Sequence, residues 1–297
     1  SMPISSNERL FIKQGIEQNA RNDGRTRMDY RVFQLTTGVI PNANGSARIK
    51  IGNTHVLVGV KVEIEKPDFA RPDAGRVECS VDISAGAAPH FVADGARSLN
   101  TRLGSEMQRL LSDSGSLDMA ALCVIPGRQC WVLYVDATVL GDGGNLLDAI
   151  SLGAKAAMLT TLVPKVEVVE GERAGTKELE VSNDPFDAVP LSIKHELPVF
   201  VSMTKIGQCF IVDATAEEES CMAGRVTAAV DSEGNICGIN KTGAGGTTRE
   251  TLADMLQCAQ RVGKELNQTL FTLLKAEECR TLRSFRFHSK IPSSPKK

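Results

Sequence analysis

Two short stretches of the chain carry residue types that could hold a metal ion or an anion. The first is DATAEEE (residues 213–219), which places four carboxylates within seven residues. Carboxylate oxygens are the ligands that Mg²⁺ prefers, so a magnesium site is one interpretation. A helix start is the other, with Thr215 as the cap and Glu217 to Glu219 in the first turn, where the helix dipole favours negative charge. The pattern favours the helix start, because the preceding KIGQCFIV contains no second carboxylate.

The second stretch is the glycine turn GDGGNLLDAI (residues 141–150), which separates a β-branched run from an alanine-rich helix pattern. Backbone N–H groups at such a turn can bind a phosphate. The glycines are followed by Asn145, Leu146 and Leu147, with no cation or hydroxyl among them. The pattern therefore favours a tight strand-to-helix connection, capped by Asp142 or Asn145.

Three arginines could contact a polyanion. Arg102 and Arg109 are seven residues apart, so they share one face of a predicted helix and could contact successive phosphates, with Arg97 nearby. A solvated helix face explains the same spacing. The basic segment 276–297 mixes arginine with phenylalanine, as single-strand binders do, but its proline-containing end favours disorder.

The cysteines and histidines give no metal or nucleophile pattern. The eight cysteines form no CxxC pair and the four histidines are scattered, so we expect no zinc site, no resident cofactor and no Ser-His-Asp arrangement. Cys123, Cys130, Cys209 and Cys237 lie in apolar strand-like runs, which predicts buried, reduced thiols and an intracellular compartment.

Composition limits the function classes. The 297 residues include 42% hydrophobic and 24% charged residues, as in folded, soluble proteins. The net charge of −2 creates no global field that would attract nucleic acid, so such contacts must be local. We expect neither a signal peptide nor a membrane span, because no apolar run approaches ~20 residues.

Hydrophobic periodicity predicts an α+β protein with helices packed on mixed sheets. An acidic excursion at 165–198 should contain one or two edge strands. We expect helices at 7–20, 98–112, 144–162 and 248–272, and strands at 31–40, 45–52, 54–64, 76–85, 129–140, 199–206, 208–214, 224–231 and 235–241.

Four ordered stretches together resemble the RNase PH family, and more narrowly the ring subunits of the RNA exosome. They are RNDGR (21–25), GSARIKIGNTHVLVGVK (45–61), CWVLYVDATVLGDGGNLLDAISLGAKAAM (130–158) and KIGQCFIVDATAEEE (205–219). The resemblance implies one RNase PH-like domain over 7–275, with halves at about 7–163 and 190–275. Each half would have a βαβ-type topology like that of ribosomal protein S5, and six such domains would close a hexameric ring around an RNA channel.

The resemblance also bears on activity. Active members use phosphate to cleave RNA from its 3′ end; an arginine after the glycine turn grips the phosphate, and two acids six residues apart hold a divalent metal. Matching residue by residue places Leu146 at the arginine, Asn145 at the small hydroxyl residue before it, and Gly207 and Asp213 at the acids. Loss of one preorganised donor typically costs about 10²–10³ in rate. The resemblance therefore implies a vestigial site, without metal or catalysis.

What remains for such a subunit is to complete the ring and to line the RNA path for 3′–5′ processing and degradation, including rRNA maturation. By residue-wise matching, Arg102 and Arg109 fall on an arginine-bearing helix that faces RNA in the family, and Arg97 is a further candidate RNA contact nearby. The implied partners are other RNase PH-like subunits, S1/KH cap subunits, associated exoribonucleases and single-stranded RNA, but no membrane. The implied location is nucleus, nucleolus and cytoplasm.

Two alternatives stay open. The chain could be an active phosphorolytic exoribonuclease that uses Asp213 and another cation close to residue 146. It could also be a protein-interaction scaffold without RNA contact, which the near-neutral charge and the acidic excursion allow.

Overall fold

The larger of two sheets comes from the N-terminal half of the chain. The computed structural model describes residues 4–84, 86–87, 93–170, 177–182, 184 and 187–288. The strand order is β1-β2-β3-β6-β4, with β5 paired to β6, and only β4 runs parallel to its neighbour. The strands are β1 (Phe33–Thr37), β2 (Gly45–Ile51), β3 (Thr54–Glu65), β4 (Arg76–Ile83), β5 (Cys123–Ile125) and β6 (Gln129–Gly141).

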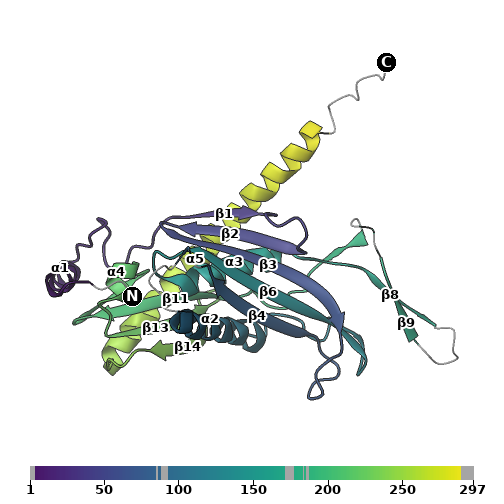
Figure 1. Cartoon of the computed structure of the whole chain (residues 1–297), viewed down its shortest axis with the longest axis horizontal. Coiled ribbons are helices and arrows are strands. Elements are labelled where there is room, and N and C mark those ends of the chain that lie inside the picture. Colours follow the sequence, from purple (N-terminus) through teal and green to yellow (C-terminus); the bar gives the residue numbers. More distant parts are fainter. Residues whose placement is uncertain are drawn as a thin grey trace.

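The second sheet is antiparallel, in the order β12-β11-β13-β14. Its strands are β11 (Val199–Ile206), β12 (Cys209–Val212), β13 (Gly224–Val230) and β14 (Ile236–Thr242). In the chain segment that connects the two sheets, β7 (Leu162–Val163) pairs with β10 (Val189–Pro190). The hairpin of β8 (Val166–Glu170) and β9 (Lys177–Val181) stands apart from the body (Figure 1), so the acidic excursion contains the predicted edge strands.

Helix α3 (Leu146–Leu159) joins the two halves. It contacts β2 and β3 on one side and β11 on the other, and its residues from Leu146 to Met158 are all buried. A helix this rich in alanine and leucine is usually covered on both sides, as its sequence predicts. The core cluster correspondingly takes side chains from both sheets.

The other helices cover the remaining faces (Figure 1). Helix α2 (Ala93–Asp113) packs on β4, α5 (Arg249–His288) packs on β11, β13 and β1, and α1 (Ser6–Glu17) contacts β12. The short α4 (Ala216–Glu219) follows β12. This is the α+β architecture with mixed sheets and packed helices that the sequence predicts.

Two expectations are wrong. Helix α5 continues to His288, whereas we expected disorder from residue 276; no glycine or proline interrupts the chain between Gly263 and Pro292. Residues 289–297 lie outside the described part. Cys237 is exposed because it lies on β14, an edge strand, while Cys130 is buried and Cys123 and Cys209 are partly buried. All eight cysteines are free thiols.

Candidate functional site

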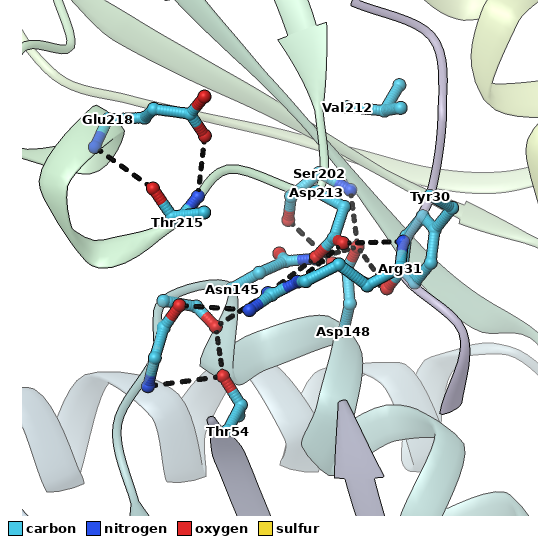
Figure 2. Close-up of polar contacts among 12 residues, drawn as sticks. Tyr30, Arg31, Thr54, Asn145, Asp148, Ser202, Val212, Asp213, Thr215 and Glu218 are labelled. Carbon is cyan, nitrogen blue, oxygen red and sulfur yellow. Dashed lines mark hydrogen bonds and ion pairs between the residues drawn. The ribbon is translucent and has the colours of Figure 1, made fainter. Parts of the chain in front are cut away.

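The glycine turn meets the acidic stretch where the two halves of the chain join. Gly144 has φ +87°, and a Cβ there would lie 2.4 Å from the Ala216 nitrogen, so only glycine allows this approach. The Ala216 N–H donates to the Gly143 carbonyl at 3.2 Å. The turn before α3 and the turn before α4 are therefore in direct contact, and Figure 2 shows this contact region in close-up.

Asp213 lies at the centre of this contact region and has no solvent exposure. Its Oδ1 accepts from Arg31 Nη2 at 2.7 Å and from Asn145 Nδ2 at 2.9 Å. Its Oδ2 accepts from the Arg31 N–H and Nε, at 2.9 and 2.7 Å, and from Arg25 Nη1 at 3.0 Å. Burial raises the pKa of Asp213, but the hydrogen bonds and charge of Arg31, with Arg25, outweigh burial and lower the pKa overall. Both oxygens of the Asp213 carboxylate are thus paired, and its charged form is favoured.

Arg31 supplies a cation at the glycine turn, although no cation is close in sequence. Its Nη1 donates to the Gly143 carbonyl at 3.0 Å and its Nη2 to the Gly144 carbonyl at 3.2 Å, as Figure 2 shows. Burial lowers the pKa of Arg31, but the hydrogen bonds and charge of Asp213 raise it by more. This guanidinium is therefore paired with the Asp213 carboxylate and with two carbonyl groups of the turn.

Two N–H groups of the turn donate to the chain's own carboxylates, and the Gly143 N–H donates to the Thr54 hydroxyl. The Asn145 N–H donates to Glu219 Oε1 at 2.8 Å, and Glu219 is ion-paired with Arg225. The Gly144 N–H donates to Asp142 Oδ1 at 3.0 Å. At this helix start, where the backbone favours an anion, the anion present is a protein side chain.

Asn145 connects the turn to a second buried carboxylate, Asp148. The Asn145 Nδ2 donates to Asp148 Oδ2 at 2.9 Å, and the Ser202 hydroxyl donates to Asp148 Oδ1 at 2.7 Å. Desolvation raises the pKa of Asp148 to about 6, against the lowering effect of hydrogen bonds from Ser202 and Asn145. The Tyr30 hydroxyl also donates to Asp148 Oδ2, and burial raises the pKa of Tyr30 well above its usual value.

The acidic stretch begins α4, as its sequence predicts. The Thr215 hydroxyl accepts from the Glu218 N–H, and the Glu218 carboxylate accepts in return from the Thr215 N–H, which makes a capping box. Glu218 is buried and accepts two hydrogen bonds from Arg21, at 2.8 and 2.5 Å. This carboxylate therefore holds the segment that precedes β1 instead of a metal ion.

The four residues that the resemblance places at the family's active site have different surroundings in this structure. Asn145 and Asp213 are in direct contact, but Leu146 is 7% exposed and belongs to the core. Gly207 lies in the β11–β12 turn, where a Cβ would be 2.7 Å from Lys13 Cε of α1. With no carboxylate at residue 207 and both Asp213 oxygens bound by arginine, these residues do not fit a divalent metal. No metal-binding group of His, Cys, Asp or Glu occurs in the part of the chain that the structure describes.

The three arginines named as RNA contacts all lie on α2 and are exposed. Arg102 and Arg109 stand four residues before and three after Glu106, so the three side chains share one helix face. Burial raises the pKa of Glu106, while the charges of Arg102, Arg225 and Arg109 oppose that rise. Arg225 also pairs with Glu219, so this charged face borders the glycine turn.

Sequence reasoning missed the residues that close the site: Arg21, Arg25, Tyr30, Arg31 and Asp148. Four of the five lie in RNDGRTRMDYR, where arginine recurs ahead of the first strand, but the stretch reads as an ordinary charged turn. The partners of Arg21, Tyr30 and Arg31 lie more than a hundred residues away in the sequence. Only the fold could identify them.

Comparison with known proteins agrees with this architecture. The model of domain 1 of the 3′ exoribonuclease (RNase PH) family matches residues 29–164, and that of domain 2 matches residues 196–262. A Dictyostelium discoideum protein, provisionally named exosome complex exonuclease RRP42, is 36% identical over 92% of this chain and 98% of its own. The exosome complex component Rrp42 of Thermococcus kodakarensis is 35% identical over 89% of this chain and 94% of its own.

Solved structures give the same answer. A chain of the Archaeoglobus fulgidus exosome, with RNA bound to the active site of that complex, superposes with a TM-score of 0.78 at 27% identity, covering 89% of this chain and 97% of the other. A chain of an archaeal exosome core superposes with a TM-score of 0.72 at 27% identity over 89% and 96%. None of the helices in the described residues has the length and apolarity to cross a membrane.

Proposed function

Because the chain belongs to the RNase PH family of 3′ exoribonucleases, we propose that it is a catalytically silent ring subunit of an RNA exosome. The Arg31–Asp213 pair carries this proposal. It neutralises the cation and the carboxylate that lie at the glycine turn, while Glu219 takes the N–H group that a phosphate would need. Leu146, which follows the turn, is buried in the core and supplies no charge for an attacking phosphate.

Membership of a ring is supported by the relatives named as exosome components and by the exosome chains that share this fold over nearly their whole length. In such a ring the chain would neighbour other RNase PH-like subunits. We extend the proposal to S1/KH cap subunits and associated exoribonucleases as further partners, and to nucleus, nucleolus and cytoplasm as locations. Imaging of the tagged chain would test the locations.

A phosphorolysis assay tests the proposal that the chain is catalytically inactive. The purified chain is incubated with Mg²⁺ and single-stranded RNA, with and without inorganic phosphate, and nucleoside diphosphates are measured. We expect no phosphate-dependent release. The name exonuclease on one relative and the position of Arg31 favour the enzymatic alternative as second candidate. Release that co-elutes with the chain, and disappears in a folded Asp213→Asn variant, would establish that alternative instead.

The second part of the proposal is that Arg102 and Arg109 of α2 contact RNA phosphates. In a reconstituted ring, Arg102→Glu with Arg109→Glu should weaken single-stranded RNA binding and flatten its dependence on salt, because phosphate contacts release counterions. The matched control is Arg261→Glu with Lys264→Glu, two exposed cations of α5. Equal RNA affinity of wild type and the α2 variant would leave a scaffold that does not touch RNA.

A further inference from the structure

A small cavity lies beside α2, on the side where this helix faces β14. Its volume is about 150 Å³, and it is lined mainly by Glu106, Arg109, Leu110, Phe200, Ala229 and Asn240. We propose that this cavity binds one base of a single-stranded RNA whose phosphates contact Arg102 and Arg109. The inference rests on the RNA-path role proposed above and adds a site to it.

The floor of the cavity is apolar and one wall is aromatic. Leu110, Phe200 and Ala229 are buried, and Phe200 presents a ring on which a base could stack. Ile239 lines the cavity from β14 although it is 52% exposed, so apolar surface stays open at the mouth. Drug-sized ligands need about 300–1,000 Å³, so this cavity has room for one ring system only.

The polar lining suggests which bases fit. Glu106 and Asn240 both line the cavity, so a carboxylate and an amide are available to a base there. A carboxylate accepts from the amino group of cytosine, and an asparagine can pair with adenine. Uracil carries a carbonyl where cytosine carries the amino group. The cavity should therefore prefer cytosine or adenine over uracil.

The neighbouring charges suggest where the backbone runs. Arg102 and Arg109 flank Glu106 on the same helix face, one turn away on either side, and both are exposed. A strand that follows this face would place phosphates on the two arginines and one base between them, over the cavity. Phosphate contacts and base stacking are the two terms that hold single strands on proteins.

The first test fills the cavity. At Gly238 an added Cβ would meet only Ala229 Cβ, at 3.8 Å, so β14 can accept a side chain that points into the cavity. In a reconstituted ring, Gly238→Leu should weaken binding of oligocytidylate and oligoadenylate at least about fivefold, and of oligouridylate less. The matched control is Gly246→Leu, because an added Cβ at Gly246 meets nothing within 4 Å.

The second test is Glu106→Gln, which leaves the cavity open. The preference for cytidylate over uridylate should shrink towards equal affinity, because the carboxylate that accepts from the cytosine amino group is gone. An unchanged preference would overturn the proposal, and this variant decides the matter if Gly238→Leu does not fold.

The outcomes separate the cavity from the wider RNA path. If Gly238→Leu binds all three oligonucleotides like wild type while the Arg102, Arg109 variant loses affinity, the cavity is not a base site but the path stands. If neither variant matters, the proposed RNA path itself is wrong. If folded Gly238→Leu fails to enter the ring, a side chain of a neighbouring subunit fills the cavity and the base proposal is overturned.

Discussion

At the scale of single residues, the unusual feature is a pair of buried carboxylates bridged by one amide. Asp213 and Asp148 both bind Asn145 Nδ2, but arginines surround only Asp213. The pKa of Asp213 is therefore lowered, while burial raises that of Asp148 to about 6. Removing a partner from a buried pair such as Arg31–Asp213 typically costs about 3–5 kcal/mol. These side chains now hold the fold together.

The opposite shifts give opposite pH dependences. An unfolded aspartate titrates near 3.9, so the raised pKa of Asp148 stabilises the fold at low pH and that contribution is lost between about pH 4 and 6. The lowered pKa of Asp213 stabilises the fold above its unfolded value and is lost as the pH falls.

Asp148→Asn isolates the first effect. The variant should be less stable overall, since an NH₂ replaces an acceptor, but its free energy of unfolding should not decline between pH 4 and 6. Relative to the variant, wild type should lose up to about 3 kcal/mol over that range. Urea unfolding across the pH range measures the difference, and parallel curves would contradict the pKa assigned to Asp148.

At the scale of elements, the contact between the α3 and α4 turns decides the site. The turn before α3 approaches the turn before α4 so closely that Gly144 has no room for a Cβ. The contact leaves no room for a phosphate between the two turns at Gly144.

Gly144→Ala tests that closure. The new Cβ would lie within 2.6 Å of backbone atoms from Ala214 to Ala216, and the residue would keep φ +87°. We expect a loss of about 3 kcal/mol or more, from strain and overpacking together. Gly127→Ala is the control: its φ is +72° with nothing within 4 Å, so only about 1–2 kcal/mol of strain applies. If denaturant unfolding shows that both variants lose the same free energy of unfolding, the close contact at Gly144 does not contribute to stability.

At the scale of the whole molecule, the two halves share one core. The buried cluster contains Leu133 of β6, Ile150 of α3 and Val201 of β11, and Arg21 and Arg31 join the segment before β1 to the β12–α4 turn. Halves bound in this way should not unfold independently.

We therefore expect one unfolding transition. Trp131, the only tryptophan, lies in β6 and reports on the N-terminal half by fluorescence, while far-ultraviolet circular dichroism reports on both halves. The two denaturation curves should coincide. A tryptophan transition displaced from the dichroism transition would mean that the halves are separate domains, against the single domain predicted over 7–275.

By itself, the sequence determined the periodic elements, the sandwiched α3 and the capping box at Thr215. Each of these depends on residues close together in the chain, where helix and strand periods act. Helix α5 runs beyond its predicted end at residue 272. The apolar face that marked the helix ends there, but no glycine or proline before Pro292 breaks the helix.

The tertiary structure alone decided what fills the glycine turn. Arg31 and Glu219 bind the turn from two separate segments, Arg225 of β13 pairs with Glu219, and no local pattern marks these residues as partners. The resemblance could suggest that the family's phosphate-binding arginine is absent at Leu146. It could not identify the side chains that bind the turn, because Arg31 is 112 residues from Gly143 and Glu219 is 74 residues from Asn145, and such contacts are fixed only when both halves bury their shared core.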